Sequence, residues 1–73
     1  MSLRPKKRSL TLNGHQTSVS LEERFWKEFC RIASVKKIPI NTLASDIDSS
    51  RELDSGLASA IRDFVLRYYM SKD

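Results

Sequence analysis

The sequence predicts a small, mainly helical domain that begins with a short β element. Residues 9–21 alternate in character with the period of two that is typical of β-strands. Three later segments instead repeat apolar side chains every three or four residues, which is the spacing of an amphipathic helix. The length of 73 residues, with 40% hydrophobic and 30% charged side chains, indicates a single domain.

The size of the chain favours self-association. One core at this length supplies only roughly 3 to 5 kcal/mol unless a disulfide, a metal or a partner subunit adds to it. Cys30 is the only cysteine and His15 the only histidine, so one chain can form neither a disulfide nor a Cys/His metal cage. We therefore expect a homodimer without metal or cofactor. The sequence shows no membrane span and no secretory signal, which predicts a cytoplasmic protein.

The first eight residues form a basic segment. Four of the thirteen basic residues lie there, and the other nine are balanced by nine acidic residues, so this segment accounts for the net charge of +4. Pro5 and the like charges beside it predict a flexible arm over residues 1–8, followed by one domain over residues 9–73. A cationic arm attracts polyanions such as nucleic acid, although a solubilising tail has the same composition.

The predicted β element contains a change of parity. Leu10 and Leu12 fall on even positions whereas Val19 and Leu21 fall on odd ones, so one straight strand would send the two pairs to opposite faces. Asn13-Gly14 is a typical two-residue hairpin turn and resolves the conflict. We therefore expect two short strands around this turn.

Such a hairpin has one apolar and one polar face. Its register places Leu12 opposite His15 and Leu10 opposite Thr17. The other face is polar throughout and carries Ser9, Thr11, Gln16, Ser18 and Ser20. An alternative is that residues 1–12 remain a loose arm and that only the second segment is a strand.

The first helix is predicted from a capping box. In Ser20-Leu21-Glu22-Glu23 the serine hydroxyl can accept a hydrogen bond from the Glu23 amide, and the Glu23 carboxylate can accept one from the Ser20 amide. The helix would then run to about Val35. Its apolar stripe consists of Phe25, Phe29, Ile32 and Ala33, widened by Trp26 and Cys30.

Two further helices follow a tight connection. Pro39 ends the first helical pattern, and the next stripe consists of Ile40, Leu43, Ala44 and Ile47. Residues 48–56 are polar and rich in turn formers, which ends the second helix there. A third helix, capped by Asp54 or Ser55, would present Leu57, Ile61, Phe64 and Tyr68 on one face.

A strand that leads directly into a helix, followed by a short turn and a second helix, resembles the ribbon-helix-helix family of the Arc/MetJ type. The string Gly14-His-Gln-Thr-Ser-Val-Ser-Leu-Glu, then Phe25-Trp26, is similar to a subgroup of short bacterial members, and the resemblance extends over residues 8–70. It implies an intertwined homodimer in which the strands of two copies pair antiparallel. The expected dimer core comprises Val19, Leu21, Phe25, Phe29, Ile32, Leu43 and Ile47.

The resemblance also implies DNA contacts. In the family, alternate side chains of the ribbon read base edges in the major groove, and by position these are Gln16, Ser18 and Ser20. The N-terminus of the second helix holds a phosphate in the family, which corresponds to Asn41 and Thr42. The remaining expected phosphate contacts come from the basic segment and are Arg4, Lys6, Lys7 and Arg8.

Two features of this sequence depart from the family pattern. Lys37 and Pro39 stand where a glycine and a small hydroxyl residue are usual, and Pro39 lacks an amide to donate to a phosphate. In addition, if residues 9–12 pair with residues 16–20, a dimer has four strands and a sheet about 15 Å wide, against a major groove about 12 Å wide. Such a sheet would not enter the groove, whereas a loose arm would leave the ribbon narrow.

We therefore expect a homodimeric DNA-binding protein that acts as a transcriptional regulator. The alternative is a dimeric protein-interaction module without sequence-specific DNA binding. No phosphate loop, nucleophile elbow or H-E-x-x-H motif is present, and one histidine and one cysteine make a nucleophile–base pair improbable, so we expect no enzyme activity.

Overall fold

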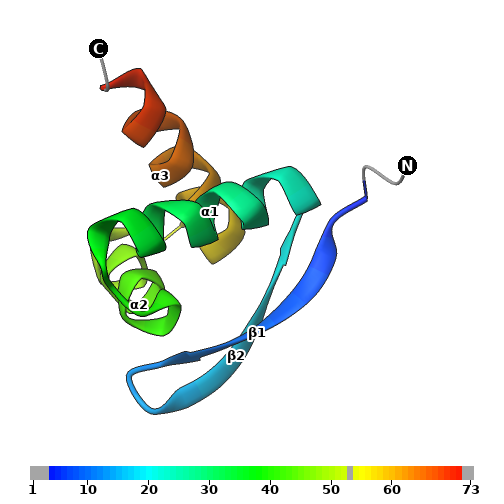
Figure 1. The fold of residues 1–73 in the computed structure, drawn as a ribbon. Helices are drawn as coiled ribbons and strands as arrows, with labels where there is room; N and C mark the ends of the chain where they lie inside the picture. Colours follow the sequence, from blue (N-terminus) through cyan, green and yellow to red (C-terminus); the bar gives the residue numbers. More distant parts are fainter. Residues whose placement is uncertain (1–3, 53, 72–73) are drawn as a thin grey trace.

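The computed structural model describes residues 4–52 and 54–71, which form a hairpin followed by three helices (Figure 1). Strands β1 (Lys6–Leu12) and β2 (His15–Leu21) pair antiparallel. The helices are α1 (Glu23–Lys36), α2 (Ile40–Ser50) and α3 (Leu57–Met70). The predicted fold class, a short β element followed by three helices, is confirmed. No helix in the described part is long and apolar enough to cross a membrane.

The hairpin turns at Asn13-Gly14. Both residues have positive φ, 52° and 85°, as the type I′ turn requires. The register is the predicted one, because Leu12 lies opposite His15 and Leu10 lies opposite Thr17. Of the two alternatives for this part of the chain, the structure therefore has the hairpin.

β1 begins earlier than the sequence suggested. Residues 6–8 belong to the strand, with Lys6 opposite Leu21 and Lys7 opposite Ser20, so the predicted boundary between arm and domain at residue 8 differs from the structure. Successive side chains of a strand point to opposite faces, which separates the cationic groups of neighbouring residues. Repulsion among them therefore does not prevent the strand from forming.

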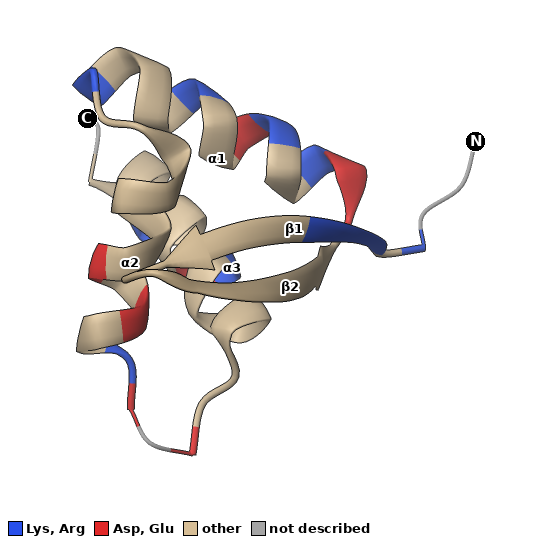
Figure 2. Cartoon of the chain, turned by 90° about the horizontal axis from the view of Figure 1, so that it is seen from below, with Lys and Arg blue, Asp and Glu red and all other residues tan. Residues whose placement is uncertain are grey.

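The inner face of the hairpin closes the core. Leu10, Leu12, Val19 and Leu21 are all buried, and Leu21 has no exposed surface. Burying one such side chain contributes roughly 1.5 to 3 kcal/mol. The hairpin is therefore an integral layer of the fold that lies across the helices (Figures 1 and 2).

α1 begins without the predicted capping box. Ser20 is still part of β2, and the residue at the N-cap position is Glu22, whose side chain makes no capping bond. The strand extends through Leu21 because that side chain is fully buried and its neighbour Ser20 is still paired with β1. The helix consequently begins at Glu23, and Ser20 stays on the exposed face of the sheet.

Lys37 makes the turn between α1 and α2. It lies in the left-handed region at φ 58°, and the amides of Lys37 and Ile38 donate back to the carbonyls of Ser34 and Ala33. This is the Schellman arrangement, in which glycine is the usual residue. Pro39 then stands at the N-cap of α2, and Ile40 is the first helical residue.

α3 packs on α1 and α2 and completes the core. Its N-cap is Gly56 rather than the predicted Asp54 or Ser55, and it makes no side-chain cap. Ile61 and Val65 are buried, and Phe64 packs edge-on against Phe29 with 6.4 Å between ring centroids. Of the residues expected in a dimer core, Phe25 is partly buried, and those buried within this one chain are Val19, Leu21, Phe29, Ile32, Leu43 and Ile47.

Candidate nucleic-acid interface

The outer face of the hairpin is entirely polar and exposed. Three of its side chains, Gln16, Ser18 and Ser20, are those that the sequence analysis assigned to base contacts, and they follow one another along β2. The same face of β1 adds Lys7, Ser9 and Thr11. The hairpin thus brings six polar side chains, one of them cationic and none acidic, onto one surface.

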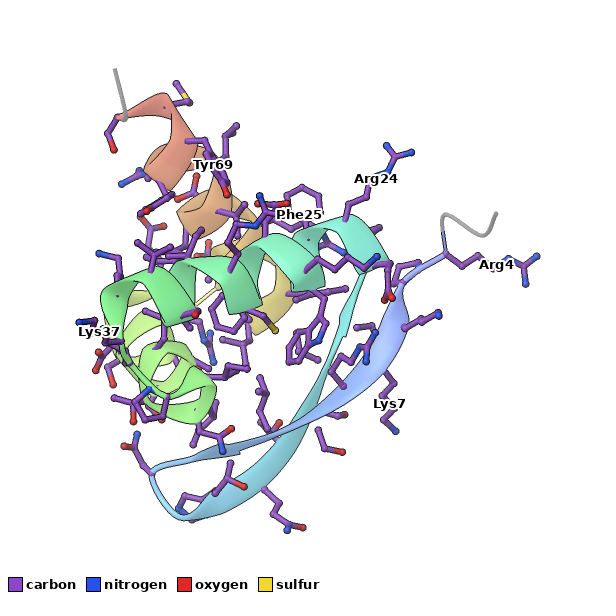
Figure 3. The ribbon with its side chains drawn as sticks, in the orientation of Figure 1. Arg4, Lys7, Arg24, Phe25, Lys37 and Tyr69 are labelled. Atoms are coloured by element: carbon purple, nitrogen blue, oxygen red, sulfur yellow. The ribbon has the colours of Figure 1, made fainter. Side chains whose placement is uncertain are left out.

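Three of the four residues expected in a basic arm are exposed at one end of the hairpin. Figure 3 shows Arg4 beyond the start of β1 and Lys7 pointing away from the helices. Lys6 lies on the opposite face of the strand, beside the end of β2, and is also exposed. These cations remain accessible to a phosphate.

Arg8 is not part of a free basic arm, as the sequence analysis expected, but is bound within the fold. Its side chain points toward α1, where Nη2 donates to Oε2 of Glu23 at 2.6 Å, and its guanidinium carbon lies 5.2 Å from the centroid of the Trp26 ring. The side chain is only 31% exposed. Arg8 therefore fastens β1 to α1, and we do not count it among the available phosphate contacts.

The first turn of α2 is partly occupied by the protein itself. The backbone amide of Thr11 donates to Oδ1 of Asn41 at 3.0 Å, so this side chain is bound to β1. Thr42 is exposed, but Asp46 lines the same pocket of about 290 Å³ and brings a negative charge. Asn41 and Thr42 both lie in the first turn of α2, yet their surroundings favour an anion less than the family pattern would.

A second arginine holds the junction of β2 and α1 from the other side. Nε and Nη2 of Arg62 donate to the two carboxylate oxygens of Glu22 at 2.9 and 3.2 Å. The Arg62 guanidinium also lies 5.9 Å from the centroid of the Phe25 ring. The hydrogen bond from Arg62 lowers the pKa of Glu22 below its ordinary value of 4.5.

The sequence analysis did not predict these two arginine-binding sites at the start of α1. Each consists of a glutamate and the aromatic residue three positions later, Glu22 with Phe25 and Glu23 with Trp26, and each holds one arginine. The acid-aromatic spacing is visible in the sequence. The partner is not, because Arg62 lies 40 residues from Glu22.

Charge is unevenly distributed over the molecule. The cartoon in Figure 2 shows cationic positions at the start of β1 and along α1, and no acidic position on the hairpin. Acidic residues gather instead at the end of α2 and in the connection to α3, where Asp48 is paired with Arg51 at 2.7 Å. The hairpin is thus free of the carboxylates that would repel a polyanion.

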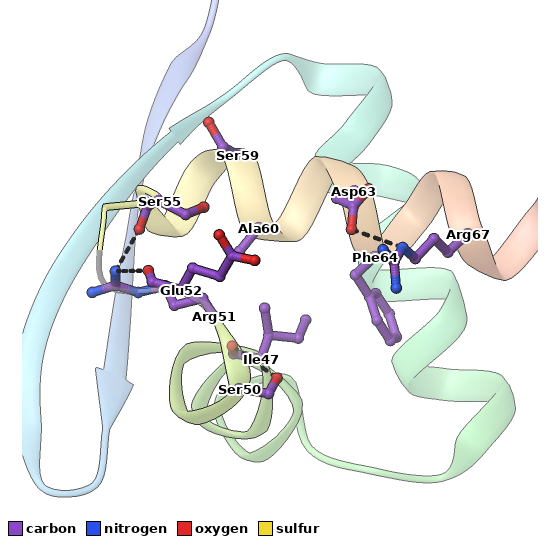
Figure 4. Close-up of a pocket in the computed structure, with 10 residues that line it drawn as sticks. All are labelled: Ile47, Ser50, Arg51, Glu52, Ser55, Ser59, Ala60, Asp63, Phe64 and Arg67. Atoms are coloured by element: carbon purple, nitrogen blue, oxygen red, sulfur yellow. Dashed lines mark hydrogen bonds and ion pairs between the residues drawn. The ribbon is translucent and has the colours of Figure 1, made fainter.

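The pocket between the end of α2 and α3 is lined in part by charged side chains that pair with each other. A pocket of about 550 Å³ lies between the end of α2 and α3 (Figure 4), and two of its charged side chains, Asp63 and Arg67, pair with each other at 3.0 Å. No three metal-ligating side chains meet within residues 4–52 and 54–71. Burial raises the pKa of the Cys30 thiol, which disfavours the nucleophilic thiolate.

The comparisons with known proteins give one match. A family model described as a ribbon-helix-helix domain matches residues 5–69. Neither the search of curated proteins nor the search of solved structures gives a match. The matched segment includes the whole hairpin and all but the last residue of α3.

Proposed function

The chain belongs to the ribbon-helix-helix family, and from this premise we propose that it is a homodimeric DNA-binding protein that regulates transcription. The family consists generally of DNA-binding transcriptional regulators that form dimers and are not enzymes. The observation that carries the proposal for this chain is the outer face of the hairpin. Its side chains are hydroxyls, an amide and a lysine, which all donate hydrogen bonds to phosphate or to base edges.

The free edge of β2 supports the dimer. In a hairpin with a two-residue turn, the two residues that flank the turn exchange backbone hydrogen bonds, and along the strands bonded and non-bonded pairs then alternate. Gln16, Ser18 and Ser20 fall in the non-bonded pairs, so their backbone amides point away from β1. Antiparallel pairing of this edge with the same edge of a second copy would satisfy these groups. The result is a four-stranded sheet with the two β2 strands at its centre, which adds the buried surface that a chain of this length needs.

The presence of β1 changes how such a sheet would meet DNA. Four strands span about 15 Å, which is wider than the major groove of about 12 Å, so the sheet would lie across the mouth of the groove. The central strands then face the bases, and the outer strands lie above the phosphates. In this arrangement Lys7 contacts phosphate, and Gln16 has the longest side chain that reaches toward base edges. We therefore expect modest sequence selectivity.

Fluorescence anisotropy on a labelled duplex tests the DNA-binding role. Affinity should fall steeply with salt, and K7Q should lower the slope of log affinity against log salt by about two per dimer, since each phosphate contact contributes about 0.9. S18A should leave that slope unchanged. Absence of binding by the wild-type protein at low salt would reject the DNA-binding role.

Proline substitution tests the dimer edge. In S18P the lost amide belongs to the free edge of β2, whereas in S9P the lost amide belongs to the free edge of β1. We expect S18P to dissociate the dimer in sedimentation while S9P does not. A wild-type protein that sediments as a folded single chain at micromolar concentration would contradict the dimer.

A second candidate is a protein-interaction module. The exposed apolar side chains favour it, because Leu66 and Met70 on α3 are 57% and 69% exposed, one turn apart. This role predicts a dimer that binds no duplex at any salt concentration. The anisotropy experiment therefore separates the two candidates.

A further inference from the structure

We propose that Asn41 closes the outer edge of β1 and thereby directs strand pairing between copies to β2. The inference rests on the homodimer proposed above and deepens it, because it names the residue that decides which edge of the hairpin pairs. The sequence analysis expected Asn41 to contact a phosphate, whereas its side-chain oxygen is bound to β1.

The hairpin has two outer edges, each formed by a strand of seven residues. Along each edge every second residue points its backbone amide and carbonyl away from the hairpin. On β1 these residues are Lys7, Ser9 and Thr11, and on β2 they are Gln16, Ser18 and Ser20. An exposed edge of this kind is a template for pairing with another chain. The backbone alone therefore gives both strands the same capacity to pair.

Asn41 makes the two edges different. It stands in the first turn of α2, which lies beside the end of the hairpin that carries the turn (Figures 1 and 2). Its Oδ1 accepts the hydrogen bond of the Thr11 amide at 3.0 Å. Two separate hollows, of about 150 and 290 Å³, both have Asn41 and Thr11 in their lining. The Asn41 side chain thus spans a gap between α2 and β1 that is otherwise open, and it covers this part of the edge.

An occupied Thr11 disfavours pairing between two β1 edges. With Ser9 on a twofold axis, antiparallel β1 strands would form three bonded pairs, Ser9 with its own copy and Lys7 with Thr11 in both directions. Two of these three pairs need Thr11, so only one remains. A register shifted to avoid Thr11 places Arg8 opposite its own copy, where like charges repel. On β2 no such side chain covers Gln16, Ser18 or Ser20 among the described residues.

Closing β1 also limits the size of the assembly. In the proposed dimer the two β2 strands are central and the two β1 strands are outermost, so each dimer has two β1 edges. If both edges could pair, every dimer would join a neighbour on each side, and repeated joining would give an open chain of dimers. Asn41 of each copy covers one of these edges, which keeps the assembly at two chains.

Sedimentation of Asn41 variants tests this role. N41A removes the acceptor of the Thr11 bond and leaves the buried side of α2 unchanged, so the fold should persist. We expect N41A to form species larger than the wild type, with a size that increases with protein concentration. N41D keeps a side-chain oxygen that accepts from the Thr11 amide, and it should sediment like the wild type.

Two controls identify the edge that pairs. T42A changes the exposed neighbour of Asn41 and should sediment like the wild type. N41A/S9P adds a proline whose missing amide belongs to the outer edge of β1, so it should return to the wild-type size. Association of N41A through any other surface would persist in N41A/S9P and would overturn the inference.

Amide hydrogen exchange, followed by NMR, gives a second readout that does not depend on assembly. S9P and N41A/S9P differ only in the acceptor of the Thr11 bond. We expect the Thr11 amide to exchange about fivefold faster in N41A/S9P, as loss of a hydrogen bond of ordinary strength implies. Equal exchange in the two variants would overturn the role of Asn41.

The outcomes separate this inference from the proposed function. An N41A protein that keeps the wild-type size at every concentration would overturn the role of Asn41 and leave the dimer through β2 intact. A wild-type protein that sediments as a single chain would overturn the dimer. If N41A then formed larger species that S9P abolished, the role of Asn41 as the residue that closes β1 would still be supported.

Discussion

Arg62 in α3 and Glu22 at the start of α1 form a bidentate ion pair, with donor–acceptor distances of 2.9 and 3.2 Å. Two parallel bonds between guanidinium and carboxylate fix the relative orientation of the groups as well as their distance. The pair therefore holds the third helix against the point where the hairpin becomes the first helix. Arg8 does the same from β1 through Glu23.

The Glu22–Arg62 pair predicts a pH dependence of stability. The pKa of Glu22 is lowered in the folded state, so its contribution is present above the ordinary value of 4.5 and is lost as the pH falls through the folded-state pKa. Thermal unfolding of wild type and E22Q at several pH values should show a difference that shrinks below pH 4.5. When both proteins also carry R62Q, the difference in stability between them should be smaller at every pH, because Arg62 is the other member of the ion pair. A wild-type advantage over E22Q that is constant from neutral to acid pH would contradict this.

The turn after α1 predicts a stabilising substitution. Lys37 has φ 58°, and a side chain in the left-handed region costs roughly 1 to 2 kcal/mol relative to glycine. We expect K37G to raise the free energy of unfolding by about 1 kcal/mol, measured by urea denaturation. K37A is the matched control, since it removes the same charge but keeps Cβ, and it should give no such gain.

The two glycines should respond differently to alanine. Gly14 has φ 85°, although a Cβ there would meet nothing within 4 Å, so G14A carries only the backbone penalty of about 1 kcal/mol. Gly56 has φ −72° and equally open surroundings, so G56A should be neutral or slightly stabilising. Equal unfolding midpoints for the two variants would be inconsistent with the turn at residues 13–14.

The role of β1 as a layer of the core predicts a large effect at Leu10. Its side chain is 3% exposed, and L10A should cost about 2 to 5 kcal/mol of unfolding free energy. T11A changes the neighbouring residue on the exposed face and should stay within about 0.5 kcal/mol of wild type. If residues up to 12 were a loose arm, both variants would unfold like the wild type.

The hairpin and the helical stripes could be predicted because their signals are local. The parity change between Leu12 and Val19, with Asn13-Gly14 between them, fixes the turn and hence the register. The apolar residues around Phe29, Leu43 and Ile61 likewise recur every three or four positions, a spacing that places them on one face only in a helix.

The helix caps and the extent of the first strand could not be predicted because they depend on distant contacts. Ser20 fits a capping box locally, but burial of Leu21 keeps it in the strand. The charges of residues 6–8 suggest an arm, but Arg8 finds Glu23 and Trp26, which lie 15 and 18 residues along the chain. A side chain whose partner is brought close only by the tertiary fold leaves no local pattern in the sequence, so the contact cannot be predicted from neighbouring residues.

The contact between Arg8 and Trp26 gives the protein an internal optical probe. Trp26 is the only tryptophan of the chain, so its emission comes from a single site under the guanidinium of β1. Loosening of the first strand, whether by added salt, by a polyanion or by truncation of the N-terminus, would change the polarity around that indole. The attachment of β1 can therefore be followed in unlabelled protein, in real time and at low concentration.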